Sequence, residues 1–506
     1  MLGPPPITRP ESPTRHPVLS STARQFVDDR WDHDIVARLS DYIRIPAKSP
    51  AFDPGWASHG HLERVARDAL AWVRTQPVRG LQAEIVALDG RTPCLFFDAP
   101  STRDGVAGAG QSGDQTVLFY GHLDKQPEMT GWRAGLGPWQ PVIQDGRLYG
   151  RGAADDGYAV YAALTSIAAL DTCAVPRPRC VGLIETCEES GSFDLPAYLD
   201  CLAARFGQVG LLIGLDSGCG DYERLWVTTS LRGLVGGVLS VDILREGVHS
   251  GNASGIVPSS FRILRLLLDR IDDSRTGRLR DPVFQSPVPP DRLEQALTAG
   301  AVLGDRIWQQ FAWVRQVDGP DGPDGEHARP VTTDPVEAIL NRTWRSTLSV
   351  IGAAGLPPLQ EGGNVLRPGT ALKLSVRLPP TVDAHRAAQR MKLLLEADPP
   401  YGARVRFDPD SAGSGWNAPP TAPWLQEALE RASLDAFGLQ PVWMGEGGAI
   451  PFISMLGERF PHSQFVITGV LGPQSNAHGP NEFLHIPTGI RLTACVASVI
   501  ADHFAR

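Results

Sequence analysis

Residues 117–128, VLFYGHLDKQPE, hold the strongest indication of the fold, because an apolar run leads directly into an imidazole and a carboxylate. Four apolar or aromatic residues precede Gly121, and His122 and Asp124 follow with one residue between them. A continuous apolar run predicts a strand buried on both faces, as in the parallel sheets of α/β proteins. The functional groups of such sheets lie beyond the carboxyl ends of the strands. We therefore expect a buried strand that delivers His122 and Asp124 to one edge of a sheet.

The same design recurs in three further segments. GRGAADDG (150–157) leads into an Ala-rich helix that is apolar on all sides, which predicts a buried helix. The apolar runs in CVGLIETCEES (180–190) and GLLIGLDSG (210–218) also end in acidic residues. Strands that alternate with helices and end in polar groups predict an open α/β sheet.

The pattern changes at GLVGGVLSVDIL (233–244), whose alternation predicts a half-exposed strand. Two strand–helix pairs follow, which predicts a compact α+β unit over residues 230–412, inserted into the first domain. The first domain then comprises residues 22–229 and 413–506. Residues 1–21 are Pro-rich and lack the apolar core of a signal peptide, which is typical of a disordered leader.

Composition excludes several classes of protein. A chain of 506 residues favours two domains, and a net charge of -9 without a basic run argues against a nucleic-acid partner. The sequence has no apolar run of membrane-spanning length, so we expect no membrane association. The seven cysteines form no C-x-x-C pair, which favours reduced thiols and a cytoplasmic location.

Eight polar residues stand at the ends of apolar strands or near the C-terminus: His122, Asp124, Asp155, Asp156, Glu188, Glu189, Asp216 and His478. Taken singly, each has an ordinary explanation as a hydrogen-bonded histidine, a helix cap or a solvated acid. Packed together, the carboxylates would repel one another strongly unless cations neutralised them. Imidazole nitrogens mixed with carboxylate oxygens suit zinc, with manganese as the alternative. The sequence therefore predicts a site for two divalent metal ions.

Seven motifs occur in one order along the chain: YGHLDKQPE, LYGRGAADDG, ETCEESGS, GLDSG, HSGNASG, GEGGAIP and AHGPNE. This ordered set resembles the dinuclear-zinc peptidase family of carnosinase, cytosolic non-specific dipeptidase, glutamate carboxypeptidase, succinyl-diaminopimelate desuccinylase and aminoacylase, over about residues 30–500. The motifs EESGS, EGGAIP and HGPNE are closest to the carnosinase and dipeptidase branch. The resemblance implies a three-layer catalytic domain with a mixed sheet, and an inserted α+β domain that serves as a lid and as the contact of a homodimer.

The resemblance also implies roles for the strand-end residues. One metal ion would be bound by His122 and Asp216, the other by Glu189 and His478, and both by a bridging Asp155. Asp124 would fix the orientation of the His122 imidazole. Glu188 would act as the general base on a water held between the metals as it attacks an amide carbonyl.

Four residues outside this group are implied to act on the substrate. His249 in GVHSGNASG matches a family histidine that stabilises the oxyanion, often from the partner subunit of a dimer. Arg377 in LSVRLPP matches an arginine that binds the substrate carboxylate. The backbone at Gly447 and Gly448 would line the same pocket.

The implied function is hydrolysis of the amide bond of dipeptides or short peptides next to a free C-terminal carboxylate. An N-acyl-amino-acid amidohydrolase with the same site is the alternative, because both substrates present an amide beside a free carboxylate. A catalytically silent scaffold would have lost Glu188 or a metal ligand, and none is missing. A nicotinamide oxidoreductase is suggested only by GAGQSG (108–113), which lies between two strands with no helix after it.

Three positions differ from the residues that the carnosinase branch usually carries. They are Lys125, Gly445 and Ala449, and we expect all three beside the substrate. The side-chain preference of the enzyme is therefore open at this point, whereas the metal ligands and the base are unaffected.

Overall fold

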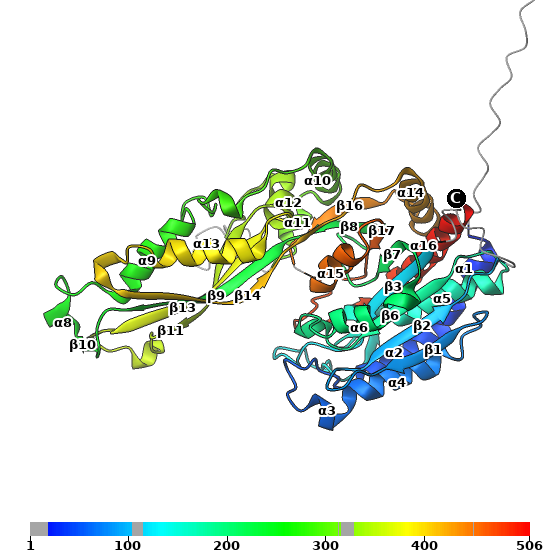
Figure 1. Ribbon diagram of the computed structural model, residues 1–506, viewed down its shortest axis with the longest axis horizontal. Coiled ribbons are helices and arrows are strands. Elements are labelled where there is room, and N and C mark those ends of the chain that lie inside the picture. The colour runs from blue at the N-terminus through cyan, green and yellow to red at the C-terminus, as the bar shows by residue number, and fades with distance from the viewer. Residues whose placement is uncertain (1–18, 104–114, 312, 315–327, 449) are drawn as a thin grey trace, which may run out of the picture.

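The computed structural model describes residues 19–103, 115–311, 313–314, 328–448 and 450–506 (Figure 1). Most of the predicted leader, the GAGQSG loop and Ala449 therefore lie outside the described residues. Figure 1 shows a compact body on one side and an elongated arm on the other, with the two joined by a neck of strands and helices.

The body is built on a six-stranded mixed sheet with the order β1-β2-β6-β3-β7-β17. Its strands are β1 (Gln82–Val86), β2 (Cys94–Ala99), β3 (Thr116–His122), β6 (Cys180–Glu185), β7 (Val209–Gly214) and β17 (Gln464–Ile467). β3 pairs in parallel with β6 and β7. β2 runs antiparallel to both of its neighbours, β1 and β6. Every residue of β3, β6 and β7 is buried, which explains their continuous apolar runs.

Helices cover both faces of this sheet. Val117 and Phe119 of β3 join one core cluster, with residues of α1 (Ser21–Arg30), α2 (Val36–Ile43), α4 (His61–Val73), α5 (Ala159–Thr172), α14 (Pro423–Phe437) and α16 (Ile486–Ala505). Leu118 and Tyr120 face the other way, into a cluster with α6 (Leu195–Cys201) and α15 (Pro451–Arg459). The predicted three-layer α/β architecture is thus confirmed, as is the fully buried Ala-rich helix, α5.

The arm is an antiparallel sheet with two helices on one face. Its strands follow the order β11-β13-β9-β14: β11 (Thr347–Ala354), β13 (Gly369–Leu378), β9 (Gly233–Asp242) and β14 (Arg404–Gly413). Their apolar side chains pack against α9 (Ser260–Ile271) and α13 (Ala384–Glu396). At the far end of the arm lie β10 (Val248–His249) and α8 (Ser250–Ala253) (Figure 1).

The neck contains a second small sheet and three helices. Its strands are β15 (Trp416–Asn417), β8 (Trp226–Leu231) and β16 (Val442–Glu446), and its helices are α10 (Pro290–Leu303), α11 (Arg306–Gln309) and α12 (Pro335–Thr343). The helices share a core with β8 and β16 rather than with the arm, although they belong to the segment predicted as the inserted unit. The exact bounds of that unit, residues 230–412, stay a prediction.

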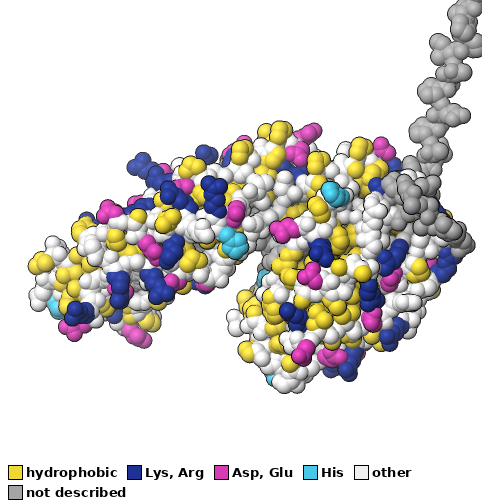
Figure 2. All heavy atoms as spheres, in the orientation of Figure 1, with side chains coloured by type: hydrophobic (Ala, Val, Ile, Leu, Met, Phe, Trp, Pro, Cys, Tyr) yellow, Lys and Arg dark blue, Asp and Glu magenta, His cyan; other side chains and the backbone are white. Residues whose placement is uncertain are grey.

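Smaller elements complete the body. A three-stranded sheet consists of β4 (Val142–Gln144), β5 (Arg147–Tyr149) and β18 (Phe483–His485), and the short helices are α3 (Trp56–His59) and α7 (Ala203–Phe206). Within the described ranges, no helix combines the length and apolar character needed to cross a membrane. In the space-filling view of Figure 2, body and arm meet at the neck and diverge below it.

Candidate metal centre

The parallel strands of the body bring their polar ends together at one sheet edge. β3 ends at His122, the loop after β6 carries Glu188 and Glu189, and the loop after β7 carries Asp216. Asp155 comes from the turn that precedes α5, and His478 from the loop between β17 and β18. The structure therefore brings together the residues that the sequence singled out, because the carboxyl ends of parallel strands face the same side.

Asp155 lies between the two histidines and turns one carboxylate oxygen toward each. Its Oδ1 is 3.3 Å from His122 Nε2, and its Oδ2 is 3.0 Å from His478 Nε2. Asp216 Oδ2 lies 3.7 Å from His122 Nε2, and Glu189 Oε2 lies 3.3 Å from His478 Nε2. Each histidine thus has one further carboxylate beside it, with Asp155 shared between the two sides.

The donor atoms fit divalent cations. Two groups of three residues each bring one ligand atom per residue within 4.8 Å of one another. One group is His122, Asp155 and Glu189, and the other is His122, Glu188 and Asp216. His122 Nε2 is buried and meets no hydrogen-bond geometry, even though Asp155 Oδ1 is near it. A buried imidazole nitrogen without a hydrogen bond, together with the carboxylate oxygens around it, forms a donor set that suits zinc or manganese.

Asp124 supports both the imidazole and the acidic loop. Its backbone carbonyl accepts a hydrogen bond from His122 Nδ1 at 3.1 Å, so in the neutral form of that ring Nε2 would be the nitrogen available to a metal ion. Its carboxylate accepts the backbone N–H of Glu188 at 3.1 Å and of Glu189 at 2.9 Å. Asp124 thus holds the loop of the predicted base as well as the ring of a predicted ligand. Asp156 contributes beside it, because its Oδ2 accepts the backbone N–H of His122.

The pKa values of the clustered carboxyl groups reflect their burial and their mutual repulsion. Burial, followed by repulsion from Asp155, raises the pKa of Asp216 to about 7. Burial is also the largest cause that raises the pKa of Glu188 and of Glu189 well above the usual value for glutamate. The pKa of Asp155 is lowered, because contacts with both histidines outweigh its burial. A divalent cation would favour the ionised form of every one of these carboxylates.

A buried ion pair that sequence reasoning missed connects the two sides of this centre. Arg151 Nη1 lies 2.6 Å from Glu482 Oε2, and Arg151 Nη2 donates to the carbonyl oxygen of Gly479 at 2.8 Å. The other Glu482 oxygen accepts the backbone N–H of Gly152 at 3.0 Å. The pair ties the turn before Asp155 to the loop after His478. The motifs GRGAADDG and AHGPNE contain both residues, but nothing local indicates that they meet.

Lys125 corrects one prediction from the sequence. Its side chain is fully buried, and its Nζ donates to the carbonyl oxygens of Tyr42 at 2.7 Å and Ile45 at 2.9 Å. Nζ also lies 3.8 Å from the centroid of the Tyr42 ring. The expectation that Lys125 borders the substrate is therefore wrong. Successive side chains of an extended segment point to opposite sides, so the residue after Asp124 faces away from the strand-end cluster.

The predicted substrate residues lie in different places. His249 belongs to β10 at the far end of the arm, and a single chain does not bring it to the metal centre (Figure 1). Arg377 lies on β13 opposite Leu234, at the end of the arm nearest the neck. Gly447 follows β16, and its carbonyl oxygen accepts a hydrogen bond from Arg232 Nε at 3.1 Å. Gly448 is next to it and has nothing near its missing Cβ.

Comparisons with known proteins agree with this architecture. The pattern of Peptidase family M20/M25/M40 matches residues 118–502. The chain is 26% identical to the cysteinylglycine-S-conjugate dipeptidase of Corynebacterium striatum, covering 75% of this chain and 79% of that protein. It is also 26% identical to the human beta-Ala-His dipeptidase, covering 93% and 90%. The structure of the dipeptidase Dug1p from Saccharomyces cerevisiae has the same fold, with a TM-score of 0.72, 19% identity and coverage of 96% and 98%.

Proposed function

The chain belongs to Peptidase family M20/M25/M40, and we propose that within this family it is a dipeptidase that cleaves the amide bond next to a free C-terminal carboxylate. The observation that supports this most directly is the position of Asp155 between His122 and His478, with the Glu188 carboxylate on the same cluster. The dipeptidases from Corynebacterium and human are similar over most of this chain, which supports the dipeptide as substrate.

The proposed metal centre uses the residues in the roles that their positions suit. His122 and Asp216 would hold one divalent cation, Glu189 and His478 the other, and Asp155 both. Zinc is the proposed metal and manganese the alternative, since the donors are nitrogen and oxygen without thiolate. Bound cations would lower the pKa of an attacking water and polarise the scissile carbonyl.

Glu188 is the proposed general base. Its Oε2 lies 4.0 Å from His122 Nε2, so it borders the cluster on the side of Asp216. A carboxylate there can take a proton from the nucleophile and return it to the leaving nitrogen. Asp124 keeps this base in place through the backbone N–H of Glu188. Arg377 and the backbone at Gly447 and Gly448 would bind the substrate carboxylate.

We infer a homodimer joined through the arm, because His249 cannot serve the metal centre of its own chain in this arrangement. The arm would carry His249 to the centre of a second copy, where its imidazole would stabilise the oxyanion. A cytoplasmic location is proposed on the seven cysteines, all of which are free.

One experiment tests the proposal directly. Elemental analysis of the purified protein should find about two metal ions per chain, and a panel of dipeptides should be hydrolysed beside uncleaved N-acyl amino acids. The Glu188→Gln variant should keep its metals and lose turnover. Turnover of acylated substrates alone would replace the proposal with a deacylase, and absence of both metal and hydrolysis after zinc or manganese is added would overturn it.

A further inference from the structure

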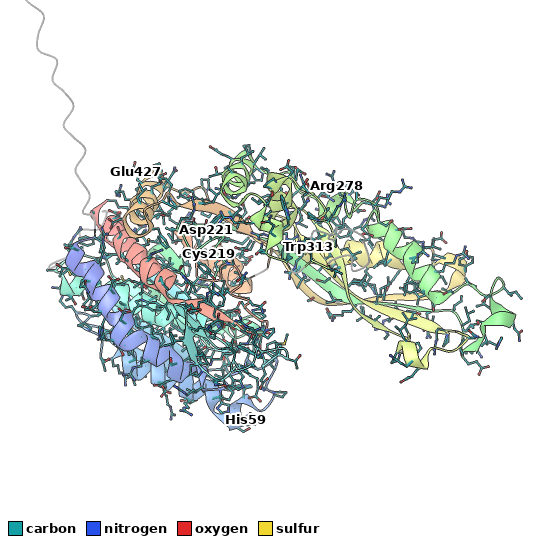
Figure 3. The ribbon with its side chains drawn as sticks, turned by 180° about the vertical axis from the view of Figure 1, so that it is seen from behind. His59, Cys219, Asp221, Arg278, Trp313 and Glu427 are labelled. Atoms are coloured by element: carbon teal, nitrogen blue, oxygen red, sulfur yellow. The ribbon has the colours of Figure 1, made fainter. Side chains whose placement is uncertain are left out.

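A cavity of about 330 Å³ lies at the junction of body and neck, between the helices of the neck and the loops that follow β7 and β17. Figure 3 shows this junction from behind, with Cys219 labelled there. The residues that matter for its chemistry are Gly218, Cys219, Arg342, Met444, Glu446 and Gln474. The mechanism proposed above gives no role to any of these side chains.

Loops that carry proposed metal ligands also form part of the wall of this cavity. Gly218 follows Asp216 by two residues, and Gln474 precedes His478 by four, so loops from both sides of the metal centre form its wall. Arg342 extends this wall toward the predicted carboxylate pocket, because a Cβ on Gly447 would lie only 3.0 Å from Arg342 Cγ. The cavity therefore adjoins the loops that carry Asp216 and His478, and Arg342 connects it to the loop at Gly447.

Arg342 and Glu446 are charged residues of this cavity that form no ion pair with any other described residue. Within the described ranges, the only hydrogen bond of the Arg342 side chain goes from Nη2 to the sulfur of Met444 at 3.4 Å. Arg342 Nε is buried without an acceptor. Glu446 Oε1 lies against the loop that carries Asp216, because a Cβ on Gly218 would be 2.5 Å from it. Both side chains are half-buried and border the cavity, so they are available to pair with a ligand that carries complementary charges.

Neighbouring arginines show why Arg342 is the available cation. Arg306 also lines the cavity, but its side chain is exposed and donates to the carbonyl oxygens of Val302 and Leu303 at the end of the preceding helix, α10. Arg232 holds the carbonyl of Gly447, and burial together with the charges of Arg377 and Arg342 lowers its pKa to about 10. Arg342 and Arg377 thus both lie near Arg232, the residue that binds the loop at Gly447. With Arg377 assigned to the C-terminal carboxylate, Arg342 is left for a second acidic group.

We propose that the enzyme prefers dipeptides whose N-terminal residue has a free amino group and an acidic side chain, and that Arg342 determines this preference. The guanidinium of Arg342 pairs with the side-chain carboxylate, for which its planar set of donors is suited. The carboxylate of Glu446 faces the ammonium group of the same residue. This inference rests on the proposed dipeptidase function and adds the substrate class to it.

The test compares substrates that differ only in charge. Glu-Ala against Gln-Ala, and Asp-Ala against Asn-Ala, should differ at least about tenfold in kcat/KM, because a charge-assisted bidentate contact contributes that much. Arg342→Gln should remove the difference by raising KM for Glu-Ala more than KM for Gln-Ala. Arg342→Lys should retain part of it, and Arg342→Glu should shift the preference to Lys-Ala. Arg265→Gln, an exposed arginine on α9 without a described partner, is the matched control and should change nothing.

Each contrary result has a distinct meaning. Equal turnover of Glu-Ala and Gln-Ala by the unmodified enzyme would overturn the acidic preference and leave the dipeptidase function intact. An equal loss for both substrates in Arg342→Gln would show that Arg342 only supports the loop at Gly447, which also contradicts the inference. Metal content and thermal unfolding of each variant identify misfolding. If Arg342→Gln misfolds, the test uses Arg342→Lys, and a full loss of the Glu-Ala preference in a folded Arg342→Lys, or no change in it, contradicts the inference. No turnover of any dipeptide by the metal-loaded enzyme would overturn the proposed function itself.

Discussion

Arg151 and Glu482 form an ion pair whose side chains are 1% and 0% exposed, with 2.6 Å between Nη1 and Oε2. The pair connects loops that are more than 300 positions apart in the chain and that carry Asp155 and His478. Breaking one partner leaves a buried charge without compensation, which is far more costly than losing a pair on the surface.

Glu482→Gln should therefore lower the free energy of unfolding by about 3–5 kcal/mol. It should also weaken cation binding, because the loop that carries His478 loses its anchor. Urea denaturation and calorimetric titration with zinc measure the two effects. Asp408→Asn is the control, since its pair with Arg406 is 46% and 71% exposed and contributes at most about 1 kcal/mol. Unchanged zinc affinity in Glu482→Gln would contradict the positioning role.

Asp124→Asn should keep the shape of the side chain while offering one acceptor where two are used. The N–H groups of Glu188 and Glu189 then compete for a single oxygen, and the loop of the base loosens. We expect a loss of about 10–100-fold in kcat/KM, as for other groups that orient metal ligands. Steady-state kinetics with metal analysis provides the measurement. A variant with full activity and two metals would show that the loop holds its position without Asp124.

Lys125→Met should destabilise the protein without altering substrate choice. The carbonyl oxygens of Tyr42 and Ile45 lose their buried donor, which costs about 1–3 kcal/mol for each unsatisfied group. The ratio of kcat/KM between any two dipeptides should remain as in the unmodified enzyme, because Lys125 faces away from the metal centre. A changed ratio, measured on the same dipeptides as for Arg342, would show that Lys125 influences substrate choice after all.

His503 should make the protein sensitive to acid. Burial lowers its pKa to about 4, whereas the unfolded chain has the usual value of about 6.5. A depressed pKa means that the unfolded state binds the proton more readily, so this contribution is complete above about pH 6.5 and is lost as pH falls toward 4. The loss amounts to at most about 3 kcal/mol. His503→Gln should flatten this part of the curve in denaturation experiments between pH 7 and 4. Parallel curves for both proteins would exclude the effect.

The proposed dimer can be tested by mixing two inactive variants. His249→Ala retains the metal centre, and Glu188→Gln retains the imidazole at the end of the arm. If the arm serves the partner, each mixed dimer regains one complete site, and random exchange restores about a quarter of full activity. The two variants, unfolded and refolded together, should therefore turn over dipeptides that neither hydrolyses alone. No recovery in a mixture shown to exchange subunits would rule out a shared site.

The sequence alone determined the strands of the body and the residues at their ends. Apolar runs such as VLFYGH can only be satisfied by burial on both faces, and parallel pairing then places His122 and Asp216 at one edge. The ordered motifs added Asp155 and His478 to the same centre. The positions of these residues could be predicted because strand patterning is local, and because the carboxyl ends of parallel strands share one side, whereas their roles stay a prediction.

Only the tertiary structure decided which polar residues meet across loops. Nothing near Arg151 in the sequence indicates Glu482, and nothing near Arg342 indicates that it lies unpaired in a cavity with Glu446. The structure also turned Lys125 inward and placed His249 at the far end of the arm. The physical reason is common to all four: contacts between segments far apart in the chain depend on how loops pack, and local periodicity does not determine that packing.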